Sequence, residues 1–270
     1  MSRDIINRYK ILAKKSLGQN FLVNEDITSE ISKLIEVSGK NIIEVGPGYW
    51  ALTQKLLGQG PSSLHLVELD KDMIEILEHR VILWELSVWD IDFRIHDRDV
   101  LEFIPEFQKY SVIANIPYYI TSPILRHFLY DIKDTPDSMI ILMQKDVWDK
   151  ILWKWKNKSS VLSLMIEKKC NVSEELFVWK ENFIPSPKIE STVLSFNTHT
   201  KYKNIDDEKF LEIIKIGFRS PRKKLLKNLV SWWFDRNKIQ EFLCQQWQDE
   251  NMRGEDWDID FWIGLWKILL

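Results

Sequence analysis

Ser111-Val112-Ile113-Ala114-Asn115-Ile116-Pro117-Tyr118 is the stretch that decides the fold. The apolar residues 111–114 predict a buried strand, and Ser122-Pro123 shortly afterwards are typical of a helix start. An amide, a proline and an aromatic ring therefore follow the carboxyl end of a strand. That edge of an open α/β sheet is where ligands bind.

The residue types in this stretch suit a particular reaction. The side-chain carbonyl of Asn115 and the main-chain carbonyl of Ile116 can each accept one N–H of an exocyclic amine. The Tyr118 ring can stack on a flat base, a contact worth roughly 1–3 kcal/mol. Holding both hydrogens of an adenine N6 frees its lone pair to attack a methyl sulfonium, which is catalysis by positioning and electrostatics. Alternatively, Asn115 and Pro117 only shape a strand–turn–helix junction.

Two earlier segments predict a nucleoside-binding edge. A buried strand from Asn41 runs into Gly46-Pro47-Gly48, and residues 51–57 then predict a helix. A glycine turn between a strand and a helix brings the main chain close to a ligand. A second apolar strand over 63–67 ends at Glu68, at the spacing of a carboxylate that binds ribose hydroxyls. The alternative for Glu68 is an ordinary acid at the end of a strand.

Further strands and helices alternate along the chain. Apolar runs predict strands over 93–95, 139–143 and 191–196, with helices over 24–37, 71–77 and 123–130. This alternation predicts an α/β, Rossmann-like parallel sheet covered on both faces. After the third strand, Asp97 or Asp99 could accept a hydrogen bond from an adenine amine on chemistry alone.

Composition limits the class of protein. A chain of 270 residues, 45% of them hydrophobic, can form one large domain or a medium domain with a small one. The polar stretch over 198–207 and the helical pattern from Glu208 onward predict a catalytic domain over 1–200 and a small helical domain over 201–270. No apolar run is long enough to cross a membrane. Cys170 and Cys244 lack metal or redox spacing, so we expect reduced thiols, no metal site and a cytoplasmic protein. We also expect a monomer.

Charge is unevenly distributed although the net charge is only −3. From Ile213 to Val230 the chain carries basic residues and no acid. Such a block predicts either a localised contact with phosphates or an ordinary solvated helix face.

A proline-stiffened loop, Phe183-Ile184-Pro185-Ser186-Pro187-Lys188-Ile189, precedes the last predicted strand. Its Phe183 ring could close the second face of a bound base. The alternative is that Phe183 packs into the core.

Taken in order, these motifs resemble the ribosomal RNA adenine dimethyltransferases of the KsgA type. The resemblance covers nearly the whole chain and rests on residues 15–22, 44–48 with 52–53, 67–70, 99–101, 115–118, 183–191 and 218–228. It implies a Rossmann-like methyltransferase that uses S-adenosyl-methionine. The product would be N6,N6-dimethyladenosine at two adjacent adenosines in the 3′-terminal hairpin of small-subunit (16S) rRNA, formed during ribosome biogenesis. The partners would be small-subunit rRNA and the immature small subunit.

The same resemblance assigns roles to individual residues. The target adenine leaves its stack and enters a pocket; the catalytic residues implied for this pocket are Asn115, Pro117, Tyr118 and Phe183. The residues implied to bind the cofactor are Asn20, Leu22, Gly46, Gly48, Glu68, Asp99 and Asn115. The residues implied to contact RNA phosphates are Arg219, Arg222, Lys223, Lys224 and Lys227.

Two alternative functions share part of this pattern. One is the sibling enzyme that methylates an adenine of large-subunit (23S) rRNA and confers macrolide resistance. The other is a ribosome-assembly factor that binds RNA without catalysis. The motif over residues 17–22 and the basic segment favour the small-subunit enzyme.

Trp50 departs from the pattern, because the family usually has glycine in that turn. We expect an indole there to crowd the methionine end of the cofactor. The chain holds 13 Trp and 9 Gly, where average usage would give roughly 19 Gly. One hypothesis is a genetic code that reads UGA as glycine, with Trp50, Trp155 and Trp247 as the candidates. The alternative is that these tryptophans are genuine.

Overall fold

The computed structural model describes residues 2–83, 85–86, 88, 90–116, 120–151, 158–246 and 251–269. The chain divides into two compact units. The first comprises Met1–Lys145 with Val172–Thr198, and the second comprises Asp146–Asn171 with His199–Leu270. Residues 146–171 thus group with the C-terminal helices, whereas the sequence boundary near residue 200 placed them with the sheet.

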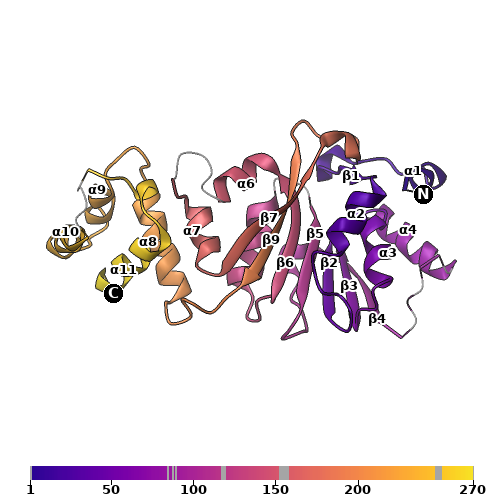
Figure 1. Ribbon diagram of the computed structural model, residues 1–270, viewed down its shortest axis with the longest axis horizontal. Helices are drawn as coiled ribbons and strands as arrows, with labels where there is room; N and C mark the ends of the chain where they lie inside the picture. Colours follow the sequence, from indigo (N-terminus) through magenta and orange to yellow (C-terminus); the bar gives the residue numbers. More distant parts are fainter. Residues whose placement is uncertain are drawn as a thin grey trace. The chain divides into compact units, whose positions relative to one another are not determined.

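A seven-stranded sheet forms the centre of the first unit, in the order β4-β3-β2-β5-β6-β9-β7 (Figure 1). The pairs from β4 through β6 are parallel, and β9 is antiparallel to β6. The α/β sheet predicted from the alternating pattern is therefore confirmed. The strands are β2 (Asn41–Val45), β3 (Ser63–Glu68), β4 (Asp92–Asp97), β5 (Ser111–Asn115), β6 (Ser138–Gln144), β7 (Cys170–Val178) and β9 (Ser191–Thr198).

Helices of the first unit follow the strands as the sequence predicts. In Figure 1, α2, α3 and α4 lie together over the β2–β3–β4 part of the sheet. The Asn24 side chain caps α2 by accepting from two main-chain N–H groups, but α2 ends at Ser32 and is shorter than predicted. The helices are α1 (Ser2–Arg8), α2 (Glu25–Ser32), α3 (Ala51–Leu57), α4 (Lys71–Ile82) and α5 (Thr121–Arg126), which continues into the π-helical turn η4 (His127–Asp131).

The order of the central strands determines where a ligand can bind. β2 lies between β3 and β5, and Val45 at its end is in register with Val67 of β3 and Ala114 of β5. The chain crosses the sheet in opposite directions from β2, so a crevice opens beyond these strand ends. The glycine turn and the Asn115 segment therefore meet at the same edge.

Strands β1, β7 and β8 were not predicted. β1 (Phe21–Leu22) pairs antiparallel with β8 (Phe183–Ile184), so Leu22 lies opposite Phe183. A two-residue strand has too few side chains to show a periodic pattern. β7 was missed because its apolar–polar alternation stops at Glu174-Glu175 and most of its side chains are exposed or half-buried.

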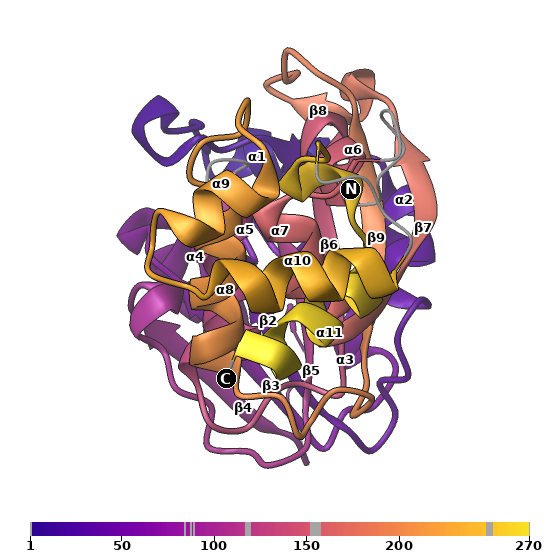
Figure 2. The same cartoon turned by 90° about the vertical axis from the view of Figure 1, so that its left-hand side faces the viewer.

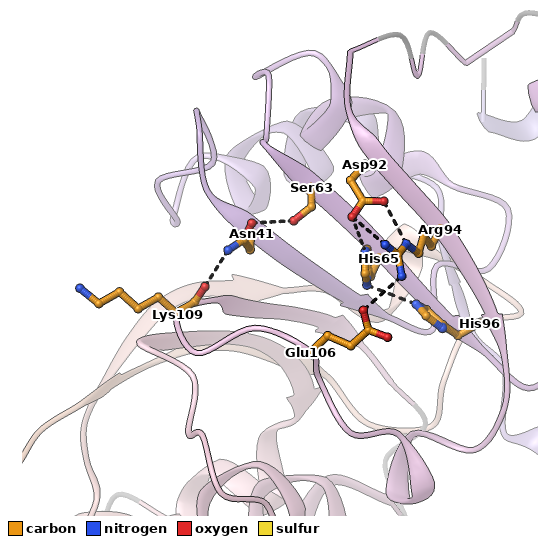
Figure 3. A network of polar contacts seen from close by, with 8 residues as sticks. All are labelled: Asn41, Ser63, His65, Asp92, Arg94, His96, Glu106 and Lys109. Atoms are coloured by element: carbon orange, nitrogen blue, oxygen red, sulfur yellow. Dashed lines mark hydrogen bonds and ion pairs between the residues drawn. The ribbon is translucent and has the colours of Figure 1, made fainter.

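A polar network runs from the starts of β2 and β3 along β3 and β4 (Figure 3). The Ser63 hydroxyl donates to Asn41 Oδ1 over 2.7 Å, and Asn41 Nδ2 donates to the Lys109 carbonyl over 2.9 Å. His65 and His96 contact each other at 3.2 Å, and burial lowers the pKa of both rings. The contacts of Asn41 and Ser63 join the starts of β2 and β3, whereas the His65–His96 contact reaches the second-to-last residue of β4.

The second unit is helical. Helices α8 to α11 pack against one another (Figure 2), with buried Ile214, Leu229, Leu243 and Trp262 in their interior. Within the described ranges, no helix is long and apolar enough to cross a membrane. The elements are α6 (Lys145–Ile151), whose first residue belongs to the other unit, α7 (Val161–Glu167), α8 (Asp207–Phe218), α9 (Leu225–Val230), α10 (Arg236–Gln245) and α11 (Ile259–Leu269).

Candidate active site

A cavity of about 140 Å³ lies in the first unit, beyond the carboxyl ends of β2, β3 and β5. The segment from Leu17 to Leu22 contributes to its wall, although it is far from those strands in the sequence. Apolar side chains such as Val67, Ile120 and Leu142 supply much of the lining, with a few polar groups among them. Cavities of this composition are typical of small-molecule sites.

The glycine turn forms the floor at the end of β2. Gly46 has a φ of +67°, and a Cβ atom there would lie 3.1 Å from the carbonyl oxygen of Asn115. Gly48 has a φ of +55°, and a Cβ atom there would lie 3.3 Å from the Phe21 ring. Both positions therefore need glycine, for backbone conformation and for space.

Glu68 is held at the end of β3 by main-chain donors. Its Oε1 accepts from the N–H groups of Leu69 and Asp70, each over 2.9 Å, and its Oε2 accepts from Gly48 over 3.3 Å. Burial raises the pKa of Glu68, and these hydrogen bonds oppose the rise. The carboxylate lines the cavity, so it can accept hydrogen bonds from a ligand.

Glu44 is a second acid in the cavity wall, to which the sequence assigned no role. Its side chain is 1% exposed, and its Oε2 has no hydrogen-bond partner in the described part of the chain. Burial raises the pKa of Glu44 to about 8, and the nearby Glu68 charge adds to the rise. With this raised pKa, Glu44 carries its proton at neutral pH.

Asp97 and Asp99, which chemistry alone left as alternatives, differ in position. Asp99 lines the cavity and Asp97 does not. Asp99 Oδ1 accepts from the N–H of Leu101 over 2.9 Å, which fixes the side chain at the start of a short 3₁₀ turn. Asp99, not Asp97, is therefore the acid available to an adenine amine.

The predicted cofactor residues converge on this cavity. Its lining includes Asn20, Leu22, Gly46, Gly48, Glu68, Asp99 and Asn115. Ile116 also lines it, and Asn115 ends β5 in register with Leu142 of β6. Pro117 and Tyr118, predicted to contact the target base, lie outside the described residues.

The Phe183 side chain does not lie where a stacking contact with a base would need it. The side chain is 3% exposed and belongs to the hydrophobic cluster that contains Leu22 and Val193. Pairing of β8 with β1 turns this ring into the core, and Phe183 is not among the described residues that line the cavity. Of the two alternatives open for Phe183, core packing is the one observed.

Trp50 also differs from its expected position. Tyr49 and Ala51 line the cavity, but the fully buried Trp50 side chain packs in the core. The Arg80 guanidinium lies 4.4 Å from the centre of its ring. The indole therefore does not crowd the cavity, which corrects the expectation from sequence.

The basic segment of the second unit runs from the end of α8 into α9. Its predicted RNA-binding side chains are exposed, and Arg219 lies over the Trp232 ring at 4.8 Å. None of them forms an ion pair with an acid in the described ranges. These side chains are Arg219, Arg222, Lys223, Lys224 and Lys227. The exposed charge is thus available to phosphates.

Comparison with protein families agrees with this geometry. The family model described as ribosomal RNA adenine dimethylase matches residues 11–256. The chain belongs to the ribosomal RNA adenine dimethylase family. Among curated dimethylase-family proteins, two named "Ribosomal RNA small subunit methyltransferase A" are similar to it. The Fusobacterium nucleatum protein is 37% identical, covering 94% of this chain and 97% of its own. The Pelagibacter ubique protein is 32% identical, covering 95% and 97%.

Solved structures share the dimethylase fold. A dimethyladenosine transferase from Plasmodium falciparum superposes with a TM-score of 0.74 at 19% identity, covering 91% of this chain and 95% of its own. The 23S rRNA methyltransferase ErmE gives a TM-score of 0.73 at 18% identity, covering 93% and 99%. At these identities the likeness concerns the fold alone.

The residues of the cavity fit the methyl donor of this family, S-adenosyl-methionine. Glu68 offers a carboxylate suited to ribose hydroxyls, and Asp99 offers an acceptor suited to an adenine amine. The apolar wall suits a purine ring. Sequence reasoning missed Glu44 and the contacts of Asp70. Their roles depend on burial and on distant partners, which no local motif records.

Proposed function

We propose that this protein transfers methyl groups to N6 of two adjacent adenosines in the 3′-terminal hairpin of small-subunit rRNA, giving N6,N6-dimethyladenosine. The observation that carries the proposal is the meeting of Gly46, Glu68, Asp99 and Asn115 at one cavity. Family membership and the names of curated relatives support it.

The cofactor-binding residues have separate tasks in this proposal. S-adenosyl-methionine, when bound, supplies an electrophilic methyl group on sulfur. Glu68 accepts from the ribose hydroxyls, and Asp99 accepts from the adenine amine. Gly46 and Gly48 keep the turn free of side chains, as their positive φ values require. Asn20 and Leu22 close the cavity from the N-terminal segment.

Catalysis rests on the acceptors at the end of β5. Asn115 Oδ1 and the Ile116 carbonyl accept the two hydrogens of the target N6, so the lone pair is no longer delocalised into the ring. This contribution is electrostatic and positional, and the chain forms no covalent intermediate. Pro117 would hold the turn and Tyr118 would stack on the base.

The exposed basic segment would contact phosphates of the RNA, which position the substrate without reading its sequence. We infer that the natural substrate is the immature small subunit and that the enzyme acts as a monomer in the cytoplasm, where ribosomes assemble. The bacterial small-subunit methyltransferases among its relatives support this substrate.

A methyl-transfer experiment tests the proposal. Labelled S-adenosyl-methionine is supplied with unmethylated small subunits, with naked small-subunit rRNA and with large-subunit rRNA. Dimethyladenosine in small-subunit RNA alone is the expected result. Label in large-subunit RNA would move the activity to the sibling enzyme. RNA binding without transfer to any substrate would identify a non-catalytic factor instead.

A further inference from the structure

Asp70 connects two walls of the cavity although it does not line it. The residue is 1% exposed and follows β3, where its main-chain N–H donates to Glu68 Oε1. Its side chain faces the N-terminal segment instead. Oδ2 accepts from Gln19 Nε2 over 2.7 Å, and Oδ1 lies 2.5 Å from Lys14 Nζ. One residue therefore touches both Glu68 and the segment opposite it.

Lys14 and Gln19, the two residues that contact the Asp70 carboxylate, are also hydrogen-bonded to each other. The main-chain N–H of Lys14 donates to Gln19 Oε1 over 2.8 Å, so the segment is closed into a loop around the carboxylate. The pKa of Lys14 is raised by Asp70 and Asp72, and the ion pair lowers the pKa of Asp70 against the effect of burial. At the far end of the segment, the Tyr49 hydroxyl donates to the Leu22 carbonyl.

We propose that Asp70 is a positioning residue that holds the segment from Lys14 to Leu22 over the cofactor cavity and thereby sets the affinity for S-adenosyl-methionine. The proposal rests on the proposed function. Gln19, Asn20 and Leu22 line the cavity, so releasing the segment removes one wall and leaves the chemistry at Asn115 unchanged.

Asp70→Asn and Asp72→Asn form a matched pair for the test. Asp72 also contacts Lys14, at 2.7 Å, but its side chain is 65% exposed. Asparagine still caps α4 well, yet it cannot hold both Lys14 and Gln19 as a charged acceptor. We expect Asp70→Asn to raise KM for S-adenosyl-methionine about tenfold or more, because hydrogen bonds to charged groups are strong, with kcat nearly unchanged. Asp72→Asn should behave as wild type.

Limited trypsin digestion of the cofactor-free proteins gives a second readout. Asp70→Asn should be cut faster at Lys14 and Lys15 than Asp72→Asn, at equal melting temperature. Lys14→Met, which breaks the same pair from the exposed side, should reproduce the KM effect. Equal KM and equal cleavage in the Asp70 and Asp72 variants would overturn the positioning role. Lack of methyl transfer in wild type would instead count against the proposed function, while the digestion still decides the role of Asp70.

A separate observation concerns the backbone of two tryptophans. Trp50 has a φ of +73° and Trp233 a φ of +71°. Left-handed backbone is uncommon outside glycine, and for a bulky residue it is a true outlier. In the described part of the chain, only Lys10 and Asp90 share it among the other residues that are not glycine.

The surroundings of these two side chains are opposite. Trp50 is fully buried, and its indole Nε1 lacks a hydrogen-bond partner among the described residues. Trp233 is 97% exposed at the turn after α9. No common packing requirement can explain both, so the shared feature is a backbone conformation suited to glycine.

We infer that positions 50 and 233 are glycine in the native protein, encoded by UGA codons that the source organism reads as glycine. The excess of tryptophan over glycine in the chain, 13 against 9, agrees with this inference. Trp262 serves as an internal control, because it lies buried in the middle of α11. Trp155 and Trp247 lie outside the described residues.

Peptide mass spectrometry of the protein from its native host decides the question, together with the codons. The expected result is glycine at positions 50 and 233, encoded by UGA, and tryptophan at position 262, encoded by UGG. Tryptophan in the native peptides at positions 50 and 233 would overturn the inference. So would UGG codons at both positions.

Discussion

Replacing Glu44 by glutamine is expected to stabilise the protein increasingly as the pH rises. Glu44 is buried in the cavity wall, and its pKa in the folded chain is about 8 against an ordinary value of 4.5. The folded state therefore binds this proton more tightly than the unfolded state. The carboxyl's contribution to stability is full below about pH 4.5 and is lost as the pH rises towards 8.

The expected gain in stability follows from the difference between the folded and the ordinary pKa of Glu44. At about 1.36 kcal/mol per pH unit, the interval from 4.5 to a neutral pH of about 7 corresponds to roughly 3 kcal/mol. Glutamine has nearly the same shape as the protonated acid but does not ionise. Unfolding of the variant is therefore not favoured by ionisation of this side chain, as it is in wild type. Up to about 3 kcal/mol of added stability at neutral pH is expected, falling to almost none near pH 4.

Urea unfolding of wild type and Glu44→Gln at a series of pH values measures this difference. Taking the difference cancels the contributions of all other titrating groups that the substitution leaves alone. A free-energy difference that stays constant with pH, or that shrinks as the pH rises, would refute the assignment of a protonated Glu44 in the fold.

Further predictions concern the site and the helical unit. Glu68→Gln should weaken binding of S-adenosyl-homocysteine by roughly 10- to 150-fold in calorimetry, because one charged acceptor is lost; an unchanged Kd would contradict its ribose role. Since the pKa of Glu68 is raised by burial, wild-type affinity should fall on acidification sooner than for an ordinary carboxylate. Asn115→Ala should abolish methyl transfer at an unchanged melting temperature. Near-normal turnover would disprove the proposed hydrogen bond from the target N6 to Asn115. Gly217→Ala should cost about 1–3 kcal/mol in urea unfolding, because its Cβ would lie 2.2 Å from Trp262 Cη2; wild-type stability would show that the ring can move.

Local motifs predicted much of the cofactor site because each consists of adjacent residues with a local physical cause. Gly46 and Gly48 could be identified from the strand–turn–helix pattern alone, since glycine is required where φ is positive and a neighbour lies close. Glu68 and Asn115 could be identified because the carboxyl ends of parallel strands meet at one edge. Chemistry alone could not choose between Asp97 and Asp99, because the choice depends on which side chain lies at the cavity; the family resemblance had implied Asp99, which is the one that lines it.

The sequence by itself therefore determined the α/β class, the order of the central motifs and most residues of the cavity wall. Only the tertiary structure decided the burial of Phe183, the position of Trp50 outside the cavity, the protonation of Glu44 and the bridge made by Asp70. These properties arise from contacts between segments distant in the chain, such as Leu22 with Phe183 or Lys14 with Asp70. Burial and electrostatic environment belong to the assembled fold, so no local pattern contains them.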